Sequence, residues 1–262
     1  MQALLIDGLN LVRRIFAAVP GEQGSKQHLE GVLTSCRLSM QRALNFHTPS
    51  HAICAFDSGG RSWRHELYSD YKLGRPPMPA SLSDGLTEIE QGFAQLGVRS
   101  LRISGFEADD VLATLAVKIA GRDGDVTILT TDKAICQLLS DHIRVYDHFN
   151  KRYLDATYIH QKFNVRPDQL VCLFALMGDK SLNIPGVRTI GIRTAAKLVN
   201  DYGSLRSILD RVEEIPGKLN AVLESGREMA ELSLQLVSLK TNIDIGVNLK
   251  QFRFSPAIMD DE

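Results

Sequence analysis

Three short apolar runs in this chain end at or close to an aspartate, and helical stretches separate them. The runs are residues 3–6 before Asp7, residues 52–56 before Asp57 and residues 126–129 shortly before Asp132. Continuous apolar runs that alternate with helices are typical of parallel strands buried on both faces. Because ligands of such sheets bind outside the carboxyl ends of the strands, we expect the three carboxylates to converge at one edge.

A fourth acidic group, Glu107-Ala108-Asp109-Asp110, opens an apolar helix. Glu107 and Asp110 are one turn apart and are expected to face one site together. Each acid also has an ordinary explanation, since acids suit helix N-termini and aspartates often close turns. Four separate segments that bring acids to one edge nevertheless favour a cation. Bunched carboxylates repel one another unless they are protonated or share a cation, and oxygen ligands suit Mg²⁺ or Mn²⁺.

The alternation of strands and helices predicts a three-layer, mostly parallel α/β sheet followed by a helical half. Strand-like runs lie at 3–7, 52–57, 98–103, 126–131 and 143–147, and helical patterns lie near 28–46, 81–96, 108–121 and 133–139. Later helices are expected at 167–177, 192–201, 204–211 and 228–239. We therefore expect a core over residues 1–155, a helical subdomain over 156–250 and a C-terminal tail over 251–262.

Composition limits the protein classes that remain. The chain has 262 residues, of which 44% are hydrophobic, enough for one substantial core. Its net charge of −1 excludes a globally basic nucleic-acid binder but permits a local basic surface. Four widely spaced cysteines without a CxxC pair favour a reduced, cytoplasmic protein. No apolar stretch reaches membrane-spanning length, so we expect no membrane partner.

Residues 183–198, from Asn183 to Leu198, resemble the helix–hairpin–helix DNA-binding motif. Pro185 and Gly186 are expected to form a tight turn, and Gly191 permits close approach of the backbone to a phosphate. Basic side chains add charge, and residues 180–197 contain no acid. Such contacts bind phosphate without reading sequence. The alternative is an αα-hairpin with a solvated basic face. The expected DNA contacts are Gly186, Arg188, Thr189, Ile190, Gly191, Ile192, Arg193, Thr194 and Lys197.

The motifs together, in their order along the chain, resemble the 5′-nuclease family of flap endonucleases and polymerase 5′–3′ exonuclease domains. They are Asp7 with Asn10, the strand end at Asp57, the run 70–75, the acidic group 107–110, the run 131–133, and Gly178-Asp179 before the hairpin. The resemblance covers about residues 3–250 and is closest to the short stand-alone bacterial form. It implies a PIN-like core, an arch at about 61–95, a helix–hairpin–helix subdomain at about 175–200, and cleavage of 5′-flap or branched DNA by a monomer.

The resemblance also implies roles for individual residues. Asp7, Asp57, Glu107 and Asp109 would hold a first Mg²⁺ or Mn²⁺, with Asp109 essential for catalysis, and Asp110, Asp132 and Asp179 would hold a second. Lys72 and Arg75 would reach the scissile phosphate, although such residues in a proline-containing loop are often only solvated. A potassium ion in the hairpin would be held by the backbone carbonyls of Leu176, Met177, Pro185, Val187 and Ile190, although an empty, hydrated turn is the alternative.

Two aromatic residues in the arch have open roles. Tyr71 is expected to stack on a base, since any base offers a π-face. Trp63 is expected either to stack in the same way or to anchor the loop.

Two departures from the family pattern weaken the second metal site. The family usually has aspartates where this chain has Ala134 and Leu182. Fewer carboxylates lower the affinity for a hard cation, so we expect one tight and one weak metal. A junction-binding protein with weak or no nuclease activity is therefore an alternative. A phosphatase with Asp7 as nucleophile is a second, but it gives no reason for the basic hairpin.

Overall fold

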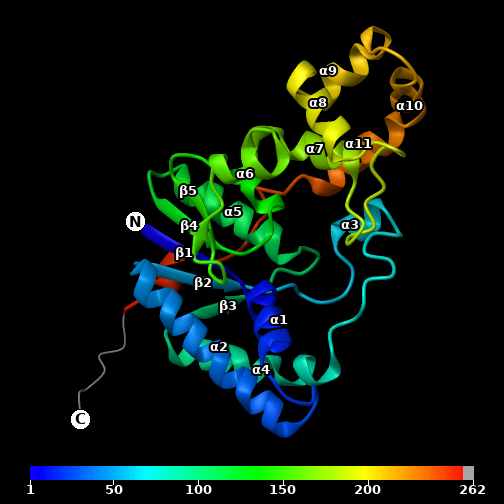
Figure 1. Ribbon diagram of the computed structural model, residues 1–262. Coiled ribbons are helices and arrows are strands. Elements are labelled where there is room, and N and C mark those ends of the chain that lie inside the picture. The colour runs from blue at the N-terminus through cyan, green and yellow to red at the C-terminus, as the bar shows by residue number, and fades with distance from the viewer. Residues whose placement is uncertain (256–262) are drawn as a thin grey trace, which may run out of the picture.

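The computed structural model, in which residues 1–255 are described, contains a six-stranded sheet between helical layers (Figure 1). The spatial strand order is β3-β2-β1-β4-β5-β6, parallel except for β6. The α/β, mostly parallel fold class is confirmed. The short edge strand β6 was not predicted. The strands are β1 (Gln2–Asp7), β2 (His51–Ala55), β3 (Arg99–Leu101), β4 (Asp125–Leu129), β5 (Ile143–Asp147) and β6 (Arg152–Tyr153).

Both faces of the sheet are buried, as the continuous apolar runs predict. In β1, Ala3 and Leu5 belong to one hydrophobic cluster, whereas Leu4 and Ile6 belong to the other. Successive side chains of a strand point to opposite faces, so each run fills two cores at once. This explains why these strands are apolar throughout rather than at every second position.

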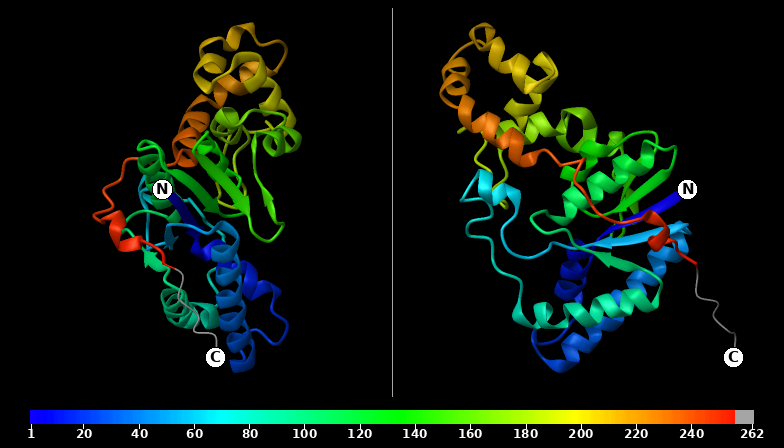
Figure 2. Two further views of the ribbon diagram at one scale, coloured as in Figure 1. Left: turned by 90° about the vertical axis from the view of Figure 1, so that its left-hand side faces the viewer. Right: turned by 180° about the vertical axis from the view of Figure 1, so that it is seen from behind.

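Three helices cover one face of the sheet, and α5 (Ala108–Ala120) packs on the other. The three are α1 (Gly8–Ala18), α2 (Lys26–His47) and α4 (Ala80–Gln95) (Figures 1 and 2). The sequence pattern did not predict α1 or the short α3 (Trp63–Leu67). The helix expected at 133–139 is the 3₁₀ helix η1 (Ala134–Leu138).

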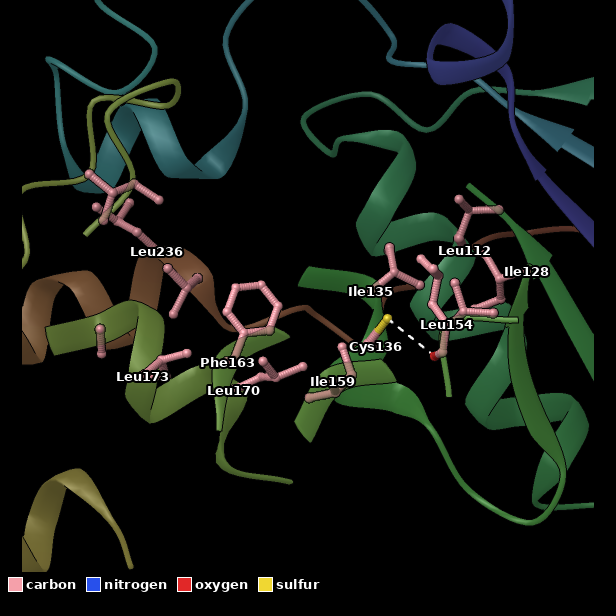
Figure 3. Packing of buried hydrophobic residues seen from close by; sticks show 14 of the residues in the cluster. Leu112, Ile128, Ile135, Cys136, Leu154, Ile159, Phe163, Leu170, Leu173 and Leu236 are labelled. Carbon is pink, nitrogen blue, oxygen red and sulfur yellow. Dashed lines mark hydrogen bonds between the residues drawn. The ribbon is translucent and has the colours of Figure 1, made fainter. Parts of the chain in front are cut away.

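The second half of the chain is helical, as expected, but it shares a core with the first. In Figure 3, Leu112 and Ile128 of the sheet half and Phe163 and Leu173 of the helical half belong to one cluster of buried side chains, with Leu154 between them. Helices α6 and α10 were not predicted. The elements are α6 (Ala156–Phe163), η2 (Pro167–Gln169), α7 (Leu170–Met177), α8 (Ile192–Tyr202), α9 (Leu205–Asp210), η3 (Val212–Glu214), α10 (Leu219–Ser225), α11 (Arg227–Val237) and η4 (Leu249–Phe252).

Two expected boundaries change. The arch was expected to run to residue 95, but α4 packs on α2 through Leu82, Ile89 and Phe93, which leaves residues 61–77 outside that layer. The tail was expected to begin at 251, but Phe252 is buried and the amide of Phe254 bonds to the Ser50 carbonyl. The rest of that tail, residues 256–262, lies outside the described residues. The remaining domain division stays a prediction.

Two further observations concern membrane-spanning helices and the cysteines. Within residues 1–255, no helix is long and apolar enough to span a bilayer. All four cysteines are free thiols, and Cys36, Cys54 and Cys136 are buried.

Candidate metal centre and nucleic-acid interface

A pocket of about 770 Å³ opens at the carboxyl ends of the strands. The strand order reverses between β1 and β4, and such switch points are where α/β sheets bind ligands. The convergence expected from the sequence is present, because acids from five separate segments line this one pocket. They are Asp7, Asp57, Glu107, Asp109, Asp132 and Asp179.

Asp7 is the acid at the centre of the switch point. Its Oδ1 accepts the Asn10 amide at 3.1 Å, which caps α1, and its Oδ2 accepts the Thr130 hydroxyl at 2.8 Å. Asn10 in turn accepts the Thr131 amide at 3.2 Å and so ties the ends of β1 and β4 together. Burial, together with the charges of Asp132 and Asp57, raises the pKa of Asp7 to about 7, although these two hydrogen bonds lower it.

Asp57 and Asp109 lie on either side of the start of α5. Asp57 accepts the Ala108 amide at 2.8 Å and thereby fixes the first turn of that helix beside the sheet edge. Burial raises the pKa of Asp109 well above its ordinary value, and Asp7, Asp132 and Asp57 raise it further. No protein group in residues 1–255 donates a hydrogen bond to the Asp109 carboxylate.

The electrostatics of these acids fit a hard cation. Asp132 also has a raised pKa, from burial and from the charge of Asp179. Several carboxylates that resist ionisation together are the pattern that a shared divalent ion relieves. Over the described part of the chain, no three Asp, Glu, His or Cys side chains are drawn together as tightly as in a formed metal site. The acids therefore surround the pocket rather than close on one point.

Glu107 is surrounded by donors rather than by other acids. Its Oε1 accepts Lys72 at 2.7 Å and the Ser62 hydroxyl at 3.1 Å, and its Oε2 accepts the Tyr71 hydroxyl at 3.0 Å. Burial raises the pKa of Glu107, but Lys72 and Arg64 outweigh it and hold that pKa below its usual range. Glu107 is thus ionised and oriented, and both it and Lys72 line the pocket.

Asp110 lies outside the pocket, which counts against the metal-ligand role expected from the sequence. Its carboxylate is fully buried and bidentate with Arg64, at 2.7 and 3.0 Å. The Trp63 indole nitrogen and the Lys240 amide each donate to it at 2.9 Å. Asp110 accepts four hydrogen bonds, as Glu107 also does, but unlike Glu107 it is fully buried and does not line the pocket. Glu107 and Asp110 both contact Arg64, at 3.4 and 2.7 Å, but Asp110 does not share the metal pocket as the helical spacing predicted.

The Trp63 side chain anchors the arch base, which was one of its two predicted roles. It bonds to Asp110, and the cations of Arg64 and Lys240 lie 4.5 Å from its ring. Tyr71 was expected to stack on a base, and this expectation is wrong. Its ring is buried and its hydroxyl is bonded to Glu107, so no face is free for a base.

The expected phosphate-contacting cations line the same pocket as the acids. Lys72 and Arg75 come from the turn at 70–75, where Lys72 has a left-handed backbone with φ of 59°. Lys72 reaches Glu107, as described above, while Arg75 lies near Arg13. Both cations therefore line the pocket that the acids line, and their contact with the scissile phosphate stays a prediction.

Asp132 and Asp179, expected at the weaker site, are both held by their own loops. Asp132 accepts the Ala134 amide at 2.8 Å, and Asp179 accepts the amide and hydroxyl of Ser181, each at 2.7 Å. Leu182 lines the pocket, whereas Ala134 does not.

Sequence reasoning missed two arginines of α1 that line the pocket, Arg13 and Arg14. The Arg14 guanidinium donates to Thr131 at 2.9 Å. Arg13 Nε is buried without a hydrogen-bond partner among residues 1–255, and burial and then the nearby Arg75 charge lower its pKa. The signal was available: both follow Asp7 by two turns of a helix that the apolar pattern Leu11, Val12, Ile15 and Phe16 encodes.

The predicted hairpin forms at the end of α7, where two backbones touch. A side chain on Gly178 would come within 2.5 Å of the Ile184 carbonyl, and one on Gly186 within 2.4 Å of the Gly178 amide. Both glycines have positive φ, so no other residue fits either position. Helix α8 then begins at Ile192 after Gly191, with no side-chain cap. Its first amides are free for an anion.

Most of the expected DNA-contacting side chains are on the surface of this hairpin, but two positions are not. The exposed or half-exposed ones are Arg188, Thr189, Gly191, Ile192, Arg193, Thr194 and Lys197. Ile190 is buried, which leaves only its backbone for a contact. The Gly186 amide already donates to the Ser233 hydroxyl at 2.9 Å, so it is not free for phosphate.

The carbonyls expected to bind potassium lie around the same turn. Those of Leu176 and Val187 accept the amides of Val187 and Ile190, at 2.7 and 3.0 Å. A carbonyl oxygen has two lone pairs, so these bonds leave room for a cation. The potassium site stays a prediction.

Comparison with known proteins follows the two halves of the chain. Residues 2–164 match the family described as the 5′-3′ exonuclease N-terminal resolvase-like domain, and residues 165–260 match its C-terminal SAM fold. A protein named flap endonuclease Xni from Shewanella pealeana is 43% identical, covering 95% of this chain and 96% of its own. The protein of the same name from Pectobacterium atrosepticum is 41% identical, with coverage of 95% and 94%.

Solved structures have the same fold. The bacteriophage T5 5′-exonuclease with bound zinc superposes with a TM-score of 0.79 at 23% identity, over 92% of this chain and 90% of that one. A T5 flap endonuclease complex with DNA and metal ions gives 0.75 at 25% identity, with the same coverage. The catalytic core of Rad2 with DNA gives 0.63 at 16% identity, over 97% and 83%. With both halves matched by family models and with relatives above 40% identity across its length, the chain belongs to the 5′-3′ exonuclease family of 5′-nucleases.

Proposed function

We propose that this protein is a flap endonuclease that hydrolyses phosphodiester bonds of branched or 5′-flap DNA with divalent metal ions. The observation that carries the proposal is the pocket, where six carboxylates and the cations of Lys72 and Arg75 face one space. A basic hairpin with an uncapped helix start extends the same surface. Relatives named flap endonuclease, and a T5 structure described with DNA and metal ions, support the substrate class.

Asp7, Asp57, Glu107 and Asp109 would hold the tighter Mg²⁺ or Mn²⁺, and Asp132 and Asp179 the weaker one. When bound, such ions polarise the phosphate and lower the pKa of an attacking water. The protein's own residues do the rest. Lys72 and Arg75 offset charge on the phosphoryl oxygens, and the amides at the start of α8 hold the duplex backbone. Asp110 has no part in this scheme because Arg64 occupies it.

The test is cleavage of a 5′-flap substrate across Mg²⁺ and Mn²⁺ concentrations, beside a blunt duplex and a single strand. Metal-dependent cutting near the junction supports the proposal. Junction binding without cutting at any metal concentration would replace it with the second candidate, a flap-binding protein. Leu182 in the pocket wall is the observation that favours this candidate, because the family usually has an aspartate there. Calorimetry is expected to show one tight and one weak metal.

We also propose a potassium ion in the hairpin, bound by the carbonyls at Leu176, Met177, Pro185, Val187 and Ile190. Its support is the tight turn made by Gly178 and Gly186, which brings backbone oxygens close together. Duplex affinity is expected to be higher in K⁺ than in an equal concentration of a large organic cation, although both screen phosphates equally. Identical salt curves would remove this ion. That the protein acts as a monomer stays a prediction, which sedimentation would check.

A further inference from the structure

Two loops that are far apart in sequence are joined beside the pocket. The Lys72 amide donates to the Leu182 carbonyl at 2.8 Å. The Asn183 side-chain amide donates to the Asp70 carbonyl at 2.7 Å. The turn that carries Lys72 is therefore held from outside, by the loop that follows Asp179.

The turn at Lys72 needs such support. Lys72 has a φ of 59°, a left-handed conformation that L-residues with long side chains seldom adopt. Such a conformation persists only where surrounding contacts fix it. The turn's own bonds are the Leu73 amide to Asp70 and the Arg75 amide to Lys72, at 2.9 and 3.1 Å. The contacts from Leu182 and Asn183 fix its place relative to Glu107, which Lys72 reaches at 2.7 Å.

The loop at 179–184 is fixed by its own hydrogen bonds and can therefore hold another segment in place. The backbones of Asp179 and Ile184 exchange two hydrogen bonds, at 3.0 and 2.8 Å, which close the loop. The Asp179 carboxylate accepts the Ser181 and Leu182 amides inside it. Asn183 has a φ of 52°, which asparagine tolerates better than most residues. Pro185 and Gly186 follow at once, so this loop is continuous with the DNA-binding hairpin.

We propose that Asn183 is a positioning residue that, with the Leu182 carbonyl, holds Lys72 at the pocket and links it to the hairpin. The inference rests on the proposed function, in which Lys72 contacts the scissile phosphate. It also gives position 182 a use that needs no carboxylate, because its backbone oxygen does the holding. Asn183 does not touch substrate or metal, and it acts only through the Lys72 turn.

The experiment uses the full-length protein with two substitutions of Asn183. Asn183→Asp has the same shape but places an acceptor against the Asp70 carbonyl, and Asn183→Gly keeps the left-handed backbone without the side chain. Asn200→Asp is the matched control, because Asn200 makes the same kind of bond, to the Asn164 carbonyl at 2.7 Å. Both Asn183 variants are expected to lower kcat on a flap substrate about tenfold. KM and DNA affinity in Ca²⁺ should change less than about twofold, and the control should match the wild type.

A double-mutant cycle with Lys72→Ala separates positioning from general damage. If Asn183 acts through Lys72, Asn183→Asp has little further effect on kcat once the lysine side chain is gone. The same tenfold loss in the Lys72→Ala background would overturn the proposal.

A readout without catalysis keeps this inference distinct from the proposed function. The Lys72 amide is expected to exchange hydrogen at least about tenfold faster in Asn183→Asp than in the wild type, since its bond to Leu182 loosens. Unchanged exchange would overturn the inference even in an active enzyme. A wild-type protein that cuts no flap would instead overturn the proposed function, while the exchange result still decides the role of Asn183.

Discussion

Two neighbouring aspartates at the start of α5 lie in opposite environments. Asp109 faces the pocket among other acids, without a donor in residues 1–255, and its pKa is raised by burial and by these neighbouring charges. Asp110 faces away and is saturated by four donors, two of them from Arg64. The neighbouring arginines differ in the same way. Arg64 is buried in an ion pair with Asp110, whereas Arg13 and Arg75 line the pocket and repel one another.

This contrast separates charges that hold the fold from charges that await a ligand. A buried acid–base pair with full hydrogen bonding satisfies itself, and removing one member leaves an unpaired charge. Bunched acids without bases instead destabilise the folded protein until a cation joins them. The Arg64 pair also joins α3 and α5 to the end of α11, since Arg64 donates to the Leu236 carbonyl at 2.8 Å. One face of the helix therefore holds the fold together, and the other lines the pocket.

The largest effect is expected from Asp109→Asn. Metal ligation supplies several kcal/mol of transition-state stabilisation, so cleavage should fall by about a hundredfold or more. Without metal, the same substitution removes a carboxylate that resists ionisation, so the protein should melt at a higher temperature in EDTA than the wild type. A flap-cleavage assay measures the loss of activity, and thermal unfolding in EDTA measures the rise in melting temperature. Asp84→Asn on α4 is the control, since Asp84 is exposed and outside the pocket. Cleavage at the wild-type rate would contradict the metal assignment.

Asp110→Ala should lower the stability of the protein and leave its metal affinity nearly unchanged. It leaves the Arg64 guanidinium buried without its acid, which costs about 3–5 kcal/mol of unfolding free energy. Denaturant unfolding checks this value, and metal affinity measured by calorimetry on the folded protein should change little. Adding Arg64→Met to the variant should recover part of the loss, because the unpaired charge is then gone. A large loss of metal affinity at unchanged stability would return Asp110 to the ligand set.

The two aspartates also mark the limit of sequence reasoning. The apolar runs predicted five strands, their buried faces and the convergence of acids, because each of these depends on local periodicity. The side chain that meets Asp110 comes from residue 64, which lies in a short helix with too few turns to carry a periodic signal. The spacing therefore placed Glu107 and Asp110 on a shared site but did not reveal that this site holds a base. The contacts of Tyr71 and Asn183 were missed for the same reason, since both depend on tertiary packing.

The raised pKa values predict a pH dependence for the metal-free protein. Asp7 has a pKa of about 7 in the folded state, above its unfolded value of about 4, so the folded state binds more protons in between. The contribution of Asp7 to stability therefore falls as pH rises from about 4 to 7. Glu107 has the opposite shift, and its stabilising contribution is lost only as pH falls below about 4.5.

The measurement for Asp7 is the difference in melting temperature between the wild type and Asp7→Asn, from pH 5 to 8 in EDTA. Histidines with lowered pKa, such as His47 and His148, stabilise with the opposite slope, but they cancel in this difference. The advantage of Asp7→Asn is expected to grow up to about pH 7 and then level off. Saturating Mg²⁺ should reverse its sign, because the ion favours the carboxylate. A difference that does not vary with pH would mean that Asp7 is already ionised at pH 5.

The smallest effect is expected from Arg13→Ala, on the pocket's basic side. Arg13 lines the pocket with a buried Nε that has no partner among the described residues, and its neighbour Arg75 repels it. Two guanidiniums that repel one another favour an anion, and DNA phosphate is the anion that the proposed function brings. The substitution should raise KM about three- to tenfold and lower the slope of log affinity against log salt by about one phosphate contact.

The control is Arg37→Ala, since Arg37 is an exposed arginine on α2. Because Arg13 pairs with no acid, the melting temperature should hold or rise slightly, whereas removal of Arg64 should lower it. A fall in stability without a change in the salt slope would place Arg13 with the structural charges instead.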